Sequence, residues 1–192
     1  RPPGKSCSAT SSKFLAAASN VSSKLILPTN STITVSTFTV GDGGANNGSV
    51  GQVDVLKLGG GTTVINANTF NVGTNGSRDI GAVSFSGATG TIKIRNQAGS
   101  GRANMAIGTR SAATSVLNDP ADGNLFDVNG HNADLLLGTV TIGTQNRGAR
   151  YDNTFNFDTG VLDMTSLTVA TRTGESANGS VPRITNATIN LG

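Results

Sequence analysis

The chain has 192 residues, of which Gly, Thr, Asn and Ser together make up 90, while charged residues are 13% and the net charge is +3. A single cysteine, Cys7, excludes an intrachain disulfide framework and a thiolate metal site. No apolar run approaches the roughly 20 residues of a membrane helix, so we expect no membrane insertion.

Residues 1–24 lie outside any repeated pattern, and we expect them to form a leader or a cap, with a short helix around KFLAAAS as one form of it. A cap here would shield the edge of the first repeated unit. The segment is basic, but it lacks the aromatic platforms of a nucleic-acid-binding surface, so no nucleic-acid partner is expected. Cys7 is either an unpaired leader residue or a bridge between chains. Cys7, Phe14 and Leu15 are the candidates for self-association at this end.

Five similar strands recur between residues 25 and 192, and each closes one repeated unit. Their sequences are STFTVGDGG, NTFNVGTNG, ANMAIGTRS, GTVTIGTQN and SLTVATRTG. The residue that follows the strand returns every 27 to 35 residues and is glycine in all units but the last: Gly41, Gly73, Gly108, Gly143 and Ala170. Repeats of this length are typical of stacked architectures. Glycine at this place supplies the positive φ of a tight corner.

Each unit contains three short strands with two inward apolar residues apiece. In the fifth unit these are Phe155 and Phe157, then Leu162 and Met164, then Leu167 and Val169. Between the second and third strands, two consecutive polar residues such as Thr165–Ser166 shift the phase of the alternation. Such phase slips turn the chain while the apolar residues stay inside. Ile189 and Leu191 begin a sixth unit and are the candidates for self-association at that end. Such strands bury little alone, but stacked about 4.8 Å apart they form continuous apolar columns.

These patterns predict an all-β protein. Its main domain, residues 25–192, is predicted to be a parallel β-solenoid (β-helix) with about three short strands per coil. The repeats correspond to five coils and the start of a sixth.

Most of the length variation falls after the third strand of a unit, for example in GTRSAATSVLNDPADGN and GTQNRGARYDN. Insertions in a solenoid collect on one edge, which is frequently its working edge. Arginines recur in these loops and could form a basic ladder for carboxylated or sulfated polysaccharide: Arg78, Arg110, Arg147, Arg150 and Arg172. The alternative is that they keep the surface soluble and pair with nearby acids: Asp79, Asp119, Asp152 and Glu175.

The units share a sequence pattern, or cadence: T-F-x-F/V, a glycine turn, an L/V strand, and then L-T-V/I-G before a T-x-R or N-G-rich loop. This cadence resembles the autotransporter-associated β-strand repeats of very large bacterial surface proteins. The likeness covers roughly residues 25–192 and is strongest in TFNFDTGVLDMTSLTVATRTG; the longer third unit departs from it. It implies an elongated, secreted and mostly non-catalytic passenger stalk.

No group of residues indicates catalysis, a cofactor or a metal site. His131 has no partners at ligand spacing, so a turn residue is expected. The acids Asp127, Asp134, Asp158 and Asp163 could include a pair on one face, but Asp158 belongs to a DTG turn, where Asp commonly bonds its own backbone. Sugar grooves favour aromatic faces, and the chain has one Tyr and no Trp. Alternating threonines in TITVSTFTV resemble an ice-binding face, but the alternation does not recur in every unit.

We therefore expect a non-catalytic extracellular β-solenoid, secreted or at the cell surface, that forms a structural or adhesive part of a surface filament or passenger stalk. Its partners would be further copies joined head to tail or the continuation of a longer chain, with surface glycans as a further ligand. The alternative is a polysaccharide-binding or polysaccharide-degrading β-helix protein.

Overall fold

The computed structural model describes most of the repeat region and parts of the preceding segment. The described residues are 5–8, 12–13, 22–41, 53–74, 80–110, 123–145, 151–171 and 185–192. Their regular structure is all β, as the sequence predicts, and these ranges contain no helix. It follows that no helix in this part of the chain has the length and hydrophobicity to cross a membrane.

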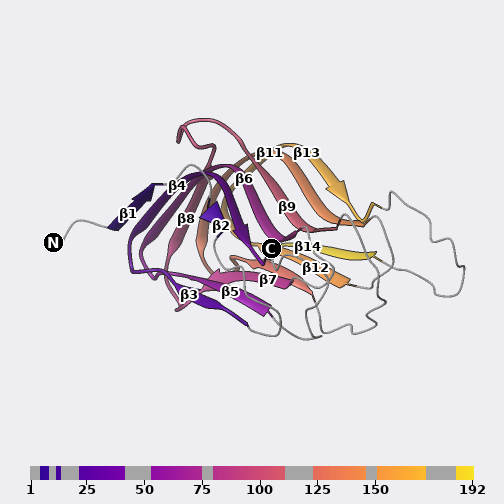
Figure 1. The fold of residues 1–192 in the computed structure, drawn as a ribbon, viewed down its shortest axis with the longest axis horizontal. Helices are drawn as coiled ribbons and strands as arrows, with labels where there is room; N and C mark the ends of the chain where they lie inside the picture. The colour runs from indigo at the N-terminus through magenta and orange to yellow at the C-terminus, as the bar shows by residue number, and fades with distance from the viewer. Residues whose placement is uncertain are drawn as a thin grey trace, which may run out of the picture.

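The strands form two sheets in which every pairing is parallel, and sheet A arches over sheet B (Figure 1). Sheet A contains β1 (Lys5–Ser8), β2 (Ser12–Lys13), β4 (Ser31–Val40), β6 (Thr62–Thr74), β8 (Thr91–Arg95), β9 (Ala103–Arg110), β11 (Asn132–Gln145) and β13 (Thr159–Val169). Sheet B contains β3 (Lys24–Ile26), β5 (Val53–Leu58), β7 (Ile80–Phe85), β10 (Asn124–Asp127), β12 (Tyr151–Phe157) and β14 (Thr185–Leu191). From β3 onward the chain alternates between the sheets, which is compatible with a parallel β-solenoid.

The second and third short strands expected in each unit are mostly one continuous strand. In β4, β6, β11 and β13 the chain passes through the expected corner without leaving sheet A. The pairing of β4 with β6 continues from Val35–Ala67 to Thr37–Thr69 across the phase slip. Only the third unit divides this strand, into β8 and β9, because residues 96–102 are inserted between them. A corner that keeps its ladder hydrogen bonds bends a strand without ending it.

The register stacks equivalent residues of successive units, as the repeat predicts. β11 and β13 pair Leu135 with Leu162, Leu137 with Met164, Val140 with Leu167 and Ile142 with Val169. The four β11 residues in this series are fully buried. Inward apolar columns therefore run along both halves of sheet A.

A row of phenylalanine rings crosses the core from sheet A to sheet B. The Phe38 and Phe70 centroids are 5.4 Å apart, those of Phe70 and Phe126 are 5.9 Å apart in an edge-on arrangement, and those of Phe126 and Phe155 are 5.4 Å apart and stacked. All four rings are fully buried. Each such pair adds about 0.5–1.5 kcal/mol beyond the area it buries.

The corner residues have the predicted backbone conformation. Gly41, Gly73, Gly108 and Gly143 have φ values of 78°, 63°, 65° and 70°. Ala170, which replaces glycine in the fifth unit, keeps the conformation at φ 52° although it carries a Cβ atom. The common conformation explains why glycine recurs at this place, since the left-handed region costs an L-residue about 1–2 kcal/mol.

Two asparagines that the sequence reading assigned to loops are buried inside sheet B. Asn124 and Asn153 belong to β10 and β12, and they are paired in register. Asn124 Oδ1 accepts a hydrogen bond from Gly81 N at 2.9 Å, and Asn124 Nδ2 donates to Asn153 Oδ1 at 2.8 Å. A Cβ atom at Gly73 would overlap the Asn124 amide, and one at Gly108 would overlap that of Asn153. The corner glycines thus make room for a buried amide ladder.

Part of the segment before residue 25 also has strand structure. β1 pairs with Ser31–Thr34 of β4, and β2 pairs with Phe38–Thr39 of the same strand. Both pairings are parallel, so this backbone extends sheet A on the far side of β4 from β6.

Candidate functional site

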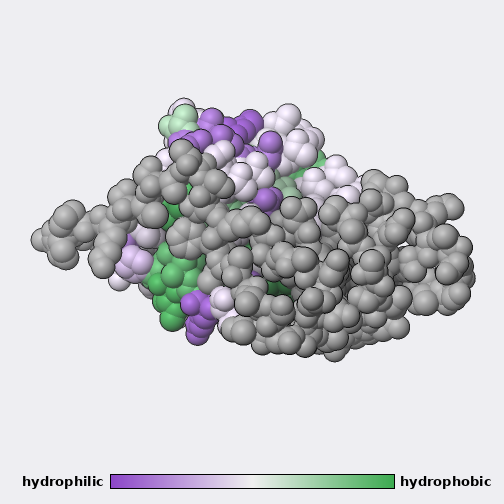
Figure 2. All heavy atoms as spheres, viewed as in Figure 1, coloured by the Kyte–Doolittle hydropathy of each residue, from purple (hydrophilic) through white to green (hydrophobic). Residues whose placement is uncertain are grey.

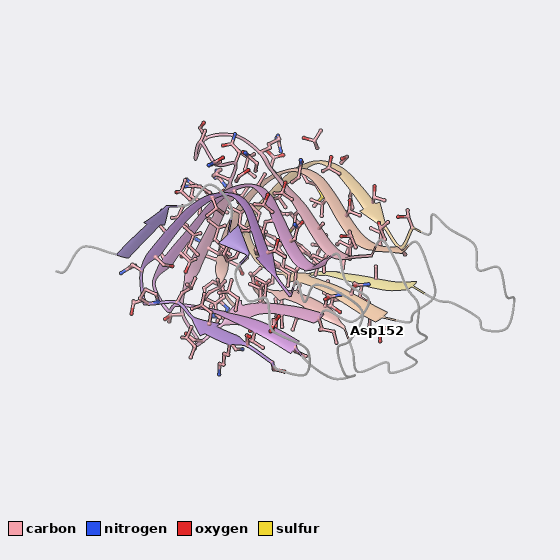
Figure 3. All side chains as sticks on the ribbon, in the orientation of Figure 1. Asp152 is labelled. Atoms are coloured by element: carbon pink, nitrogen blue, oxygen red, sulfur yellow. The ribbon has the colours of Figure 1, made fainter. Side chains whose placement is uncertain are left out.

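The loop arginines expected to form a basic ladder fall mostly outside the described residues. Arg78, Arg147, Arg150 and Arg172 are not among them, and Arg110 is described only as backbone at the end of β9, opposite Gln145. Of the acids expected to pair with them, only Asp152 is described, and Figure 3 labels it in β12 of sheet B, where it is half-buried. The polysaccharide ladder therefore stays a prediction.

The candidates for self-association divide in the same way. Phe14 and Leu15 lie outside the described residues, while the Cys7 backbone lies in β1 opposite Ile33. Ile189 and Leu191 are in β14, opposite Phe155 and Phe157 of β12.

The sequence reading missed two arginines that bind acids across the outer face of sheet A. Arg95 at the end of β8 donates from Nη1 to the Asp134 carbonyl oxygen at 2.8 Å and from Nη2 to the Asp134 carboxylate at 2.5 Å. Lys93 Nζ lies 3.7 Å from the same carboxylate. Asp134 on β11 is thus held by two cations of the preceding unit.

Arg102 reaches further, because the insertion of residues 96–102 carries it over β11. Its Nη1 donates to the Leu137 carbonyl oxygen at 2.8 Å, and its Nη2 donates to both carboxylate oxygens of Asp163 at 2.9 and 2.8 Å. The hydrogen bond from Arg102 is the main reason why the pKa of Asp163 is lowered below its ordinary value. Arg102 therefore ties the third unit to the fifth, 61 residues away.

Asp158 and His131 connect turns of successive units, whereas Asp127 Oδ1 accepts from Asn129 N within its own turn. His131 is a turn residue, as expected: its Nδ1 faces the Asn129 carbonyl oxygen at 2.7 Å, its Nε2 faces that of Gly87 at 2.8 Å, and its ring stacks on Phe85 with centroids 3.9 Å apart. The DTG motif suggested that Asp158 would accept a hydrogen bond from the backbone of its own turn, but the structure shows a different partner. Asp158 Oδ2 accepts from Gly130 N at 2.7 Å in the preceding unit, while Oδ1 is buried without a partner.

Among the described residues, each sheet ends in a strand with exposed inward side chains at its C-terminal end. β13 is the last strand of sheet A and β14 the last of sheet B among the described residues. Leu167 and Val169 are 44% and 37% exposed and Leu191 is 63% exposed. Val140 and Ile142, the residues of β11 that pair with Leu167 and Val169, are 1% exposed. Figure 2 shows a further hydrophobic patch near β3, where Ile26 is 58% exposed.

The described residues present two edge strands and the apolar columns that end at them. Within the described ranges, no three His, Cys, Asp or Glu residues gather closely enough to hold a metal ion. Asp134 and Asp163 are bound to arginine and Asp158 to a backbone N–H group, which suits these acids to holding units together. No family model, curated protein or solved structure matches the chain.

Proposed function

We propose that the chain is a structural, non-catalytic β-solenoid segment of an extracellular filament or surface stalk. In this proposal five coils and the start of a sixth form a rigid rod, and the rod is extended by stacking a further coil on its open end. Parallel ladders and continuous inward columns supply the rigidity, since the strands of each unit pair with those of its neighbours in both sheets.

The observation that supports it best is the contrast between β11 and β13. The inward positions of the second half of the strand are buried in β11 and exposed in β13, at Leu167 and Val169, and among the described residues β13 is the edge strand of sheet A. Unpaired strand edges with apolar side chains are templates for a further strand. A second copy that adds its own first strands there would bury Leu167, Val169 and Leu191 and would continue both sheets.

The charged residues support a structural role as well. A polysaccharide-degrading site needs carboxylates that are available to protonate or attack a sugar. Asp163 instead binds Arg102, Asp134 binds Arg95, and Asp158 accepts from the turn at Gly130. These contacts join one unit to another.

Sedimentation velocity and electron microscopy over a wide concentration range test this function. We expect rods that lengthen with concentration and show an axial repeat of about 4.8 Å. Leu167→Asp, which places a charge in the open column, should suppress lengthening. Thr165→Asp, at an exposed position of the same strand, is the matched control and should leave it intact. A chain that stays monomeric up to its solubility limit would refute assembly by this end.

A further inference from the structure

One outer face of sheet A is a two-dimensional array of small hydrogen-bonding side chains. It is the outer surface of the strand segments that close each unit, and we call it the threonine face. Its first column contains Thr37, Thr69, Asn104, Thr139 and Ser166, and its second contains Thr39, Asn71, Ala106, Thr141 and Thr168. The residues between the columns are buried in the first four units (Phe38, Phe70, Met105 and Val140), so these two columns point outward.

The composition of this face differs from that of the rest of sheet A. Nine of its ten positions carry a hydroxyl or an amide, and none is charged or aromatic. The other half of the same outer surface carries Lys93, Arg95, Asp134 and Asp163. The TxT pattern is complete in the first and fourth units, and serine or asparagine replaces one threonine in the fifth and second. The alternating threonines do not recur in every unit, but serine or asparagine takes most of the places where threonine is missing. The face therefore carries hydroxyl or amide groups in all five units.

The side chains of the threonine face are held in order. Asn71 Nδ2 donates to Thr39 Oγ1 at 3.3 Å, and Ser166 Oγ donates to Thr139 Oγ1 at 3.3 Å. Threonine is β-branched and restricted at χ1, so its hydroxyl and methyl groups keep fixed positions. Along the columns the spacing is about 4.8 Å, and between them it is about 6.6 Å, twice the rise per residue of a parallel strand.

The accessible part of the face lies over β9, β11 and β13. Asn104, Thr139 and Ser166 are exposed, and Thr141 and Thr168 are half-buried. Thr39, by contrast, is buried, and β2 pairs with β4 at this residue. A ligand would therefore meet the last three units.

We propose that the threonine face binds an ordered lattice of water molecules, the surface of an ice crystal. Such a lattice presents donors and acceptors at fixed intervals in two dimensions and has neither charge nor an aromatic surface. Hydroxyls and amides can both donate and accept, and rigid groups lose little entropy on binding. A polyanion would need cations on this face, and a sugar chain would favour aromatic platforms. The inference does not depend on assembly through β13 and β14.

Partition into slowly grown ice tests the proposal. The wild-type chain should be enriched in the ice fraction, whereas a globular protein without such a face is rejected into the liquid. Thr141→Lys places a strongly hydrated ammonium group in the centre of the array and should abolish the enrichment. Thr34→Lys, on the half of the surface that already carries charges, is the matched control and should keep it. Circular dichroism and melting curves show that each variant is folded.

If Thr141→Lys does not fold, Thr139→Lys at the exposed neighbouring column replaces it. Rejection of the wild-type chain from ice would overturn the proposal. Equal enrichment of the Thr139 or Thr141 variant and of the control would overturn the assignment to this face. Association of wild-type chains face to face, lost in Thr141→Lys and without partition into ice, would also overturn it and would identify a second copy as the occupant.

Discussion

Replacing Asn124 with alanine should destabilise the fold far more than its size suggests. The change removes the acceptor of the Gly81 N–H and the donor to Asn153 Oδ1, both in a buried environment. A buried polar group that loses its partner costs about 1–3 kcal/mol, so we expect a loss of about 2–4 kcal/mol in the free energy of unfolding. For a domain of this size that is a fall of roughly 5–15 °C in Tm.

Thermal and urea unfolding followed by circular dichroism measure this change. Thr154→Ala serves as the matched control, because Thr154 neighbours Asn153 in β12 but points outward. We expect the control to change the free energy of unfolding by less than about 0.5 kcal/mol. If Asn124→Ala and Thr154→Ala lowered Tm equally, the buried amide ladder would not be a stabilising feature.

A double-mutant cycle with Gly73 sharpens the test. In the wild-type background Gly73→Ala places a Cβ atom against the Asn124 amide, in addition to forcing alanine to φ 63°. In the Asn124→Ala background the overlapping amide is absent, and only the conformational cost of about 1–2 kcal/mol remains. Gly73→Ala should therefore be less harmful in the double mutant. Strictly additive losses would show that the two residues do not interact.

Two further predictions concern the Arg102 contact and the fifth corner. Arg102→Gln should raise the pKa of Asp163 toward its ordinary value, and Arg95→Gln should not, as a carboxyl titration by NMR would show. The wild-type pair contributes stability above the unfolded pKa of about 3.9 and loses it as the pH falls below that value. Ala170→Gly should raise the free energy of unfolding by about 1 kcal/mol, because glycine removes the Cβ strain at φ 52°. Ala106→Gly, in an ordinary strand, should lower it by about 0.5–1 kcal/mol; equal effects of the two glycines would contradict the strain argument.

The strands and their stacking could be predicted because the same short alternation recurs. In one unit, Leu162 and Met164 alone do not distinguish a buried strand from a loop. Equivalent pairs such as Leu135 and Leu137 one unit earlier make the alternation a column, and the column fixes the register. The corner glycines could be predicted for the same reason. Among the many glycines of the chain, they are the ones that recur at a fixed place, directly after the closing strand.

The contacts that tie distant units together could not be predicted. The sequence marks residues 96–102 as a departure from the repeat, but the contact of Arg102 with Asp163 depends on how that insertion crosses β11. Asn124 and Asn153 were assigned to loops because an inward position was expected to be apolar. A weak signal did exist: an asparagine stands two residues before the inward Phe126 and again two before Phe155.

The buried amides also bear on how similar units find their correct neighbours. Apolar columns of Val, Ile, Leu and Phe are nearly alike from unit to unit, so hydrophobic burial alone would tolerate a shift by one unit. The amide ladder does not, because Asn124 lies beside Gly81, which has no side chain, and accepts a hydrogen bond from its N–H group. Shifted by one unit, Asn124 would lie beside Asp54, which occupies the position equivalent to Gly81 and carries a buried side chain there. The polar residues of the core thus select one stacking among several that the apolar residues permit.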